Sequence, residues 1–193
     1  MNLFYLNTLK NLKTYLPMMA AAGLFLTSCS NDDPDPVNEE EVITTMTITL
    51  TPQGAGDVVT LQSRDLDGDG PNPPVVTVSG PLLASTTYNG SIELLNETET
   101  PAEDITEEVE EEADEHQFFF TVGGTLSAST TYANFDGNGD PLGTQFNLQA
   151  GDASVGSFSV TLRHDLKKPN DGTLSDAGGE TDIAQTFDLT IIP

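Results

Sequence analysis

Short alternating segments separated by turns dominate the chain after its first 40 residues, and they constrain the fold more than any other feature. Within VITTMTITL, the apolar residues Met46, Ile48 and Leu50 alternate with threonines, as in a strand with one buried face. Loops such as PQGAGD and DGDGPNPP separate similar segments. The pattern predicts a mostly β protein with a single antiparallel, immunoglobulin-like β-sandwich. We expect strands at residues 42–50, 57–63, 74–78, 87–95, 116–122, 130–135, 144–149, 156–164 and 184–192.

One segment departs from this pattern and predicts a single acidic helix over residues 101–115. Thr100 is suited to cap it, Pro101 fits its first turn, and Glu103 fits a capping box. Apolar residues then recur at helical spacing and form a narrow stripe. Carboxylates crowd the rest of the segment and repel one another, so a cation or a basic partner would stabilise the helix.

The N-terminal segment has the features of a secretory signal. Lys10 and Lys13 precede the short apolar run YLPMMAAAGLFL and the tetrapeptide LTSC, which ends at Cys29. The run is too short for a transmembrane helix, which needs about 20 apolar residues. LTSC resembles the lipobox of bacterial lipoproteins, which implies cleavage before Cys29 and its acylation, for example with palmitate. We therefore expect a signal peptide (1–28), a lipidated Cys29 with a flexible acidic tether (29–40), and a β-sandwich domain (41–193).

The residues that follow Cys29 bear on where the protein is located. The stretch SNDDPDPVNEEE resembles the export signal of Bacteroidota surface lipoproteins, which implies a lipid-anchored, surface-exposed protein of the outer membrane. The alternative is a lipoprotein that faces the periplasm with an ordinary linker. Cys29 is also the only cysteine, so the rest of the chain has no thiol for disulfides, zinc–thiolate sites or thiol catalysis.

The charge of the chain restricts its partners. Its net charge is −25, and all of its acidic residues lie after Cys29. Such a surface repels nucleic acid and anionic headgroups and attracts cations or basic proteins. The alternative explanation for this charge is solubility and spacing from the membrane.

The segment DLDGDG is the first candidate cation site. Asp65, Asp67 and Asp69 alternate and a glycine follows, as in the first half of a calcium-binding loop. The bidentate glutamate expected at the twelfth position is replaced by Val76, so the segment is not an EF-hand. A looser calcium turn and a solvated Asp/Gly turn remain the two interpretations.

The segment DGNGDP is a second candidate calcium turn. Asp136, Asn138 and Asp140 repeat the alternate-oxygen spacing. The signal is weaker here, because Asn-Gly and Asp-Gly pairs are ordinary turn formers.

The only two histidines are the third candidate site. In extended conformation His116 shares a face with Phe118 and Phe120, and His164 lies at the end of another predicted strand. Two imidazoles beside carboxylates suit zinc, copper or iron. The alternative is two separate histidines at strand ends, with His116 compensating the acidic segment before it. Whether the two strands are neighbours stays open.

A family resemblance rests on the lipobox together with DLDGDG, LLNETETPAEDITEEVEEEADEHQFFF and VTLRHD. The chain resembles small Bacteroidota lipoproteins labelled "type 1 periplasmic binding fold superfamily protein" over most of residues 40–165. The label implies a two-lobed α/β ligand binder, whereas the strand pattern of this chain predicts a β-sandwich. The resemblance assigns no catalytic or binding residue.

These features together predict a lipid-anchored binding protein that is not an enzyme. The sequence has no nucleophile-elbow pattern and no phosphate-loop lysine. We expect capture of a metal ion or small nutrient, beside an outer-membrane transporter. The alternative is a structural adhesion or docking module whose acidic helix contacts a basic protein.

Overall fold

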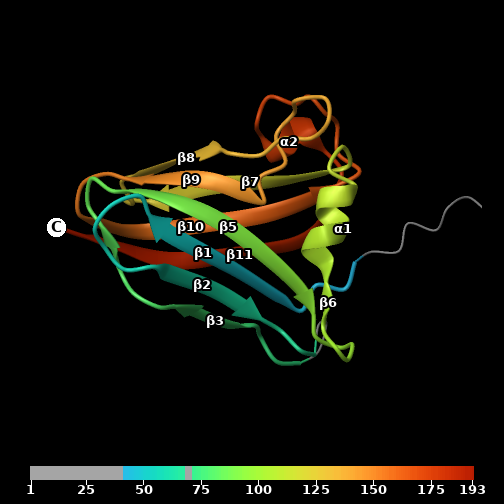
Figure 1. The fold of residues 1–193 in the computed structure, drawn as a ribbon, viewed down its shortest axis with the longest axis horizontal. Coiled ribbons are helices and arrows are strands. Elements are labelled where there is room, and N and C mark those ends of the chain that lie inside the picture. Colours follow the sequence, from blue (N-terminus) through green and yellow to red (C-terminus); the bar gives the residue numbers. More distant parts are fainter. Residues whose placement is uncertain (1–40, 68–70) are drawn as a thin grey trace, which may run out of the picture. The chain divides into compact units, whose positions relative to one another are not determined.

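Two β-sheets packed face to face form the domain, as the strand pattern predicts (Figure 1). The computed structural model describes residues 41–67 and 71–193. The predicted signal peptide (1–28), the tether with Cys29 (29–40), and Asp69 lie outside the described residues. The two-lobed α/β architecture that the family label implies is not what the described residues form.

The larger sheet has seven strands in the order β3-β2-β1-β5-β9-β8, and the short β6 pairs with β5 off this path. Its pairs are antiparallel, and Met46, Ile48 and Leu50 of β1 face the interior, as the alternation predicts. Its strands are β1 (Thr45–Pro52), β2 (Val59–Arg64), β3 (Val75–Val78), β5 (Thr87–Asn96), β6 (Glu103–Asp104), β8 (Ala128–Tyr132) and β9 (Gln145–Ala150).

The smaller sheet has the order β4-β11-β10-β7. Its strands are β4 (Leu82–Leu83), β7 (His116–Gly124), β10 (Ser154–His164) and β11 (Glu180–Ile192). The pairing of β11 with β4 is parallel, whereas β10 pairs antiparallel with β11 and β7, as expected for a mostly antiparallel sandwich. Strands β4 and β6 were not predicted, because two residues are too short to show an alternating pattern.

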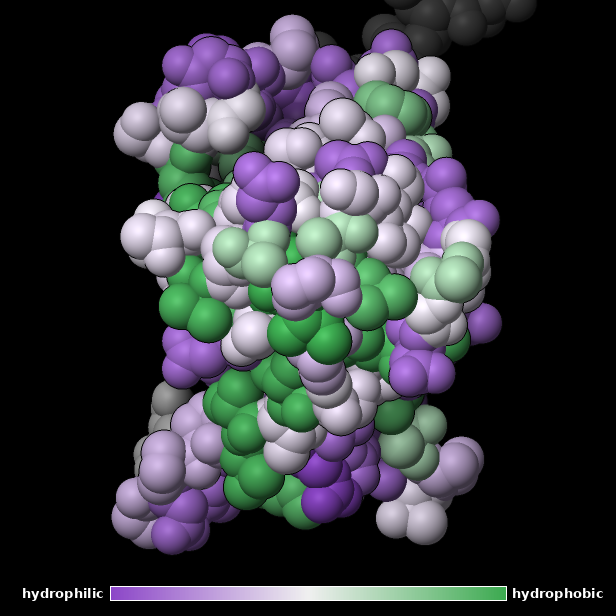
Figure 2. Space-filling model, turned by 90° about the vertical axis from the view of Figure 1, so that its left-hand side faces the viewer, coloured by the Kyte–Doolittle hydropathy of each residue, from purple (hydrophilic) through white to green (hydrophobic). Residues whose placement is uncertain are grey.

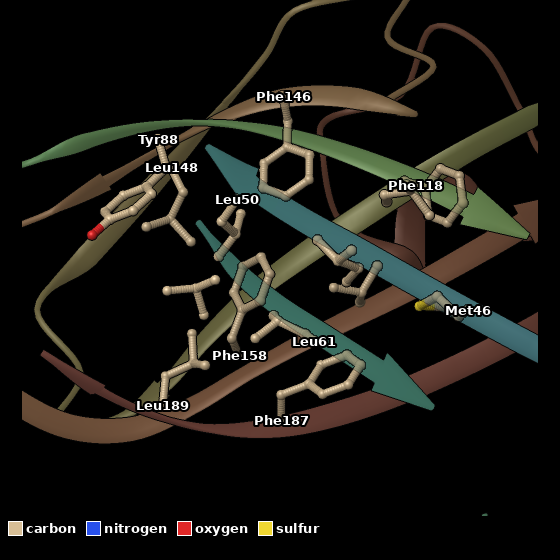
Figure 3. Close-up of a cluster of buried hydrophobic side chains, with 14 of the residues drawn as sticks. Met46, Leu50, Leu61, Tyr88, Phe118, Phe146, Leu148, Phe158, Phe187 and Leu189 are labelled. Atoms are coloured by element: carbon tan, nitrogen blue, oxygen red, sulfur yellow. The ribbon is translucent and has the colours of Figure 1, made fainter. Parts of the chain in front are cut away.

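The core lies between the sheets and is built from one face of each. Phe146 of the larger sheet and Phe158 and Phe187 of the smaller sheet point into the same space (Figure 3). All three are at most 1% exposed, and the ring centroids of Phe146 and Phe158 are 6.1 Å apart. Burial of each such side chain stabilises the fold by about 1.5–3 kcal/mol, so these aromatic contacts join the two sheets.

Helix α1 spans Ile105–Glu111, so the predicted helix over residues 101–115 is wrong at both ends. Glu103 and Asp104 form strand β6 and pair with β5, so their backbone is extended and the helix begins only at Ile105. The N-cap is therefore Asp104, whose carboxylate accepts a hydrogen bond from the Thr106 N–H at 3.0 Å. Turns over residues 112–115 then lead into β7.

A second helix, α2 (Leu174–Ala177), is one turn long and was not predicted. Ala177 packs with Phe119 and Leu166 in a small cluster outside the main core. This cluster covers the outer side of β7 near the end where α1 lies (Figure 1).

The two ends of the sandwich differ in their chemistry. Figure 2 shows the end away from α1, where apolar side chains reach the surface between polar ones. Val58, Val155 and Ile192 are among the exposed apolar residues of the loops and strand ends there. The opposite end holds α1 together with both histidines, so the ionisable groups of interest lie at that end.

The contact between Gly90 and Phe146 gives a direct test of this packing. A Cβ added at Gly90 would lie 2.5 Å from the Phe146 ring, which faces it across the β5–β9 pair. We expect Gly90→Ala to lower the free energy of unfolding by about 1–3 kcal/mol through overpacking. Chemical denaturation measures the change.

Gly54→Ala is the matched control, because a Cβ at Gly54 meets no atom within 4 Å. Phe146→Leu added to Gly90→Ala should recover part of the loss. Equal stability of Gly90→Ala and Gly54→Ala would contradict the packing described for β5 and β9.

Candidate metal centre

The register between β7 and β10 places His116 directly opposite His164. His116 begins β7 and His164 ends β10, and both side chains face inward, with 0% and 5% of each residue exposed. Their rings stack with centroids 4.4 Å apart and an interplanar angle of 20°. The structure thus brings together the two histidines that the sequence could not relate to each other.

A hydrogen bond to the backbone fixes the protonation of the His116 ring. Its Nδ1 lies 3.1 Å from the Glu112 carbonyl oxygen, in the turn that follows α1. A carbonyl only accepts, so Nδ1 must carry the proton and donate it. The Nε2 atom is therefore left with its lone pair, which is the state required of a metal ligand.

Two carboxylates face this lone pair. Glu41 Oε1 lies 3.5 Å from His116 Nε2, and Asp182 Oδ2 lies 3.9 Å from it. Glu41 precedes β1 and Asp182 belongs to β11, so three separate parts of the chain converge here. We call Glu41, His116 and Asp182 the inner site. Their side chains are 10%, 0% and 2% exposed, respectively.

Burial perturbs the titration of the inner site. It raises the pKa of Glu41 to about 7, and the neighbouring negative charge of Asp182 adds to the effect. Burial also lowers the pKa of His116 below its ordinary value, which keeps the ring neutral near pH 7. Both shifts reflect the cost of placing charge in this interior without compensation.

The inner site also contains polar atoms that lack hydrogen bonds. Among the described residues, His116 Nε2 and Glu41 Oε2 are fully buried and have no hydrogen-bond partner. Buried polar atoms in this condition are rare and call for an explanation such as a bound ion. A cation would compensate both atoms and the surrounding negative charge.

The spacing of the donor atoms suits such an ion. Separations of 3.5 and 3.9 Å are too long for hydrogen bonds. Ligands that each lie about 2.0–2.2 Å from a zinc ion stand roughly 3 to 4 Å from one another. One imidazole nitrogen and two carboxylate oxygens at these distances form a chemically reasonable set for a transition metal.

The stacking changes the hypothesis that both histidines bind one ion. A metal bound to an imidazole nitrogen lies in the plane of that ring, where the lone pair points. Two nearly parallel rings 4.4 Å apart do not direct their lone pairs at one point. His164 instead faces Asp182, whose Oδ1 lies 4.0 Å from His164 Nδ1. In this arrangement His164 is a neighbour of the inner site. The ligand atoms of Glu112, His116 and His164 also lie within 4.8 Å of one another, so a site shared by both histidines stays a prediction.

The first predicted calcium turn is described only in part. Asp67 accepts a hydrogen bond from the Asn72 side chain at 2.7 Å, and its N–H donates to Asp65 Oδ1 at 3.3 Å. Asp69 lies outside the described residues. Calcium binding by Asp65, Asp67 and Asp69 stays a prediction.

In the second predicted calcium turn, Asp136 has a structural role. Its Oδ1 accepts the backbone N–H groups of Asn138 and Asp140 at 2.8 and 2.9 Å, and its Oδ2 accepts from Lys168 Nζ at 3.3 Å. Burial raises the pKa of Asp136, but these donors outweigh it and hold the pKa below its usual range. Calcium at this turn also stays a prediction, and it would compete with the Lys168 ammonium group.

Two residues of the inner site were not predicted. Glu41 falls at the end of the acidic run NEEE, where nothing distinguishes it from its neighbours. Asp182 lies in GGETDIAQ, at the start of β11, where a lone aspartate resembles any solvent-facing residue. Only the long-range pairing of β10 with β11 brings Asp182 beside the histidines.

Comparison with known proteins adds no further constraint. No family model, no curated protein and no solved structure matches this chain. Among the described residues, no helix has the length and apolar character needed to cross a membrane.

The Lys168–Asp136 pair gives a test of the structure around the site. The Lys168 and Asp136 side chains are 6% and 1% exposed, and Lys168 also donates to the Ala113 carbonyl at 2.6 Å. We expect Lys168→Met to lower the free energy of unfolding by about 3–5 kcal/mol, because it leaves a buried carboxylate without its counter-charge. Urea denaturation followed by circular dichroism measures the loss.

Lys167→Met is the neighbouring control. Lys167 pairs with Asp176 at 2.9 Å, but these side chains are 61% and 34% exposed. Its loss should lower the unfolding free energy by less than about 1 kcal/mol. Equal effects of the two substitutions would contradict the buried role of Lys168.

Proposed function

We propose that this protein is a lipid-anchored binding protein of the outer membrane or cell surface that captures a transition-metal ion. The observation that supports this proposal most strongly is the buried, unprotonated Nε2 of His116 facing Glu41 and Asp182. Zinc, copper and iron suit a donor set of one imidazole and two carboxylates. The strongly acidic chain would raise the local concentration of cations, and an adjacent outer-membrane transporter would receive the ion.

Binding is favoured over catalysis by the burial of the donors. A catalytic metal keeps an open position for water or substrate. The three inner-site side chains are at most 10% exposed, which favours holding an ion over presenting it to a substrate. The protein is therefore proposed to act without catalysing a reaction.

A second candidate function is docking to a basic protein through α1. Burial and the charges of Glu103, Glu112 and Glu111 raise the pKa of Glu108 above its usual value. A basic partner would relieve this mutual repulsion. In this alternative a metal ion only stiffens the end of the sandwich.

Zinc titration of the mature protein in detergent, followed by calorimetry, tests metal capture. We expect Glu41→Gln and Asp182→Asn each to weaken zinc binding by more than about 100-fold, because loss of an outer-shell partner alone costs about 10–100-fold. Both substitutions preserve side-chain shape. Glu107→Gln on the exposed face of α1 is the control and should leave the affinity unchanged. Equal affinity in all four proteins would refute the inner site.

Circular dichroism on the same preparation separates capture from docking, and a labelling experiment tests the lipid anchor. Capture predicts that the chelated protein keeps its circular dichroism spectrum, whereas unfolding on chelation would favour a structural ion and the docking function. Incorporation of labelled palmitate, abolished by Cys29→Ala, is expected for the lipid anchor. Label retained in Cys29→Ala would rule out acylation at this residue.

A further inference from the structure

We propose that the protein binds a second divalent cation at an outer site formed by His164, Glu115 and Asp165. This proposal rests on the inner site of the proposed function and extends it to a centre of two ions. His164 Nε2 lies 3.7 Å from Glu115 Oε2 and 3.9 Å from Asp165 Oδ1. These separations match those of the inner site and again exceed hydrogen-bond length while suiting donors around one ion.

The outer site contains more than surface carboxylates. The His164 side chain is only 7% exposed, and its Nε2 is aimed at the two carboxylates. Glu115 and Asp165 are 54% and 55% exposed, so water can complete the coordination of an ion there. A buried imidazole with two solvated carboxylates suits an exchangeable divalent transition metal.

Asp182 connects the two sites. Its Oδ2 faces His116 Nε2 in the inner site, and its Oδ1 faces His164 Nδ1 at 4.0 Å. A histidine that binds metal through one nitrogen commonly directs the N–H of the other toward a carboxylate, which orients the ring. Asp182 thus faces both histidines. Its 4.0 Å contact with His164 Nδ1 is longer than a hydrogen bond, so the two groups must draw closer if Asp182 is to orient His164 when the outer ion binds.

The charge of the cluster favours two ions over one. Glu41, Asp182, Glu115 and Asp165 supply four carboxylates around two imidazoles. When the four carboxylates are ionised, two divalent cations balance their charge and one leaves an excess of negative charge.

The stacked geometry of the histidines agrees with two ions. Rings that are nearly parallel hold their in-plane lone pairs apart, so each ring is placed to bind its own ion. The inner ion would be enclosed, and the outer ion would contact solvent. The outer site is therefore the position at which an ion exchanges with the surroundings.

The stoichiometry of zinc binding tests the outer site. The mature protein is dialysed in detergent against buffered free zinc, and bound zinc per chain is measured by mass spectrometry of the metal. We expect about two zinc ions per wild-type chain and about one in Glu115→Gln/Asp165→Asn, because the inner and outer sites are separate donor groups. Glu41→Gln should weaken the inner ion while the outer ion remains.

Glu107→Gln/Glu111→Gln is the matched control, because it removes two carboxylates from the exposed face of α1 nearby. It should keep about two ions. Loss of one ion in this control as well would show diffuse binding to acidic residues and overturn the outer site.

The remaining outcomes separate this proposal from the proposed function. One ion in the wild type that is unaffected by Glu115→Gln/Asp165→Asn would overturn the outer site and leave the inner site intact. No bound zinc in the wild type would overturn both sites. Thermal melting of each variant confirms that the exposed substitutions leave the fold unchanged.

Discussion

The pairing of β7 with β10 is the constraint on which the ionisable end of this protein depends. Its register places His116 directly opposite His164 at the edge of the core. Both inward-facing side chains therefore lie near carboxylates instead of apolar side chains. A shift of either strand by one residue would turn its own histidine outward, because successive strand residues point to opposite faces. The aromatic core further along the same strands favours this register, since a shift would expose the fully buried Phe118 or Phe158.

Several loops reinforce the geometry that the strands establish. Lys168 donates to the Ala113 carbonyl and to Asp136, and it thereby ties the turn after α1 to two other loops. The Glu112 carbonyl in the same turn fixes the His116 ring, and Glu115 at its end faces His164. One buried ammonium group therefore supports the segment that supplies contacts to both histidines.

The sequence predicted the sandwich well, because alternation and turn residues are local signals. All nine predicted strands are present, with ends displaced by a few residues. The predicted start of α1 was wrong. Thr100, Pro101 and Glu103 have the sequence of a helix cap, but residues 103–104 instead adopt extended backbone and pair with β5. The histidines were identified as candidates, yet their contact depends on a pairing across 48 positions of sequence that no local pattern encodes. Glu41 and Asp182 were missed for the same reason.

The position of the bound ion tests the central claim most directly. Crystals of the zinc-loaded protein would be measured at the zinc absorption edge, and the anomalous difference map would locate the metal. The account predicts a peak in the plane of the His116 ring, about 2.0–2.1 Å from Nε2, with Glu41 and Asp182 as ligands. Anomalous peaks confined to the surface of α1, with none beside His116, would contradict it.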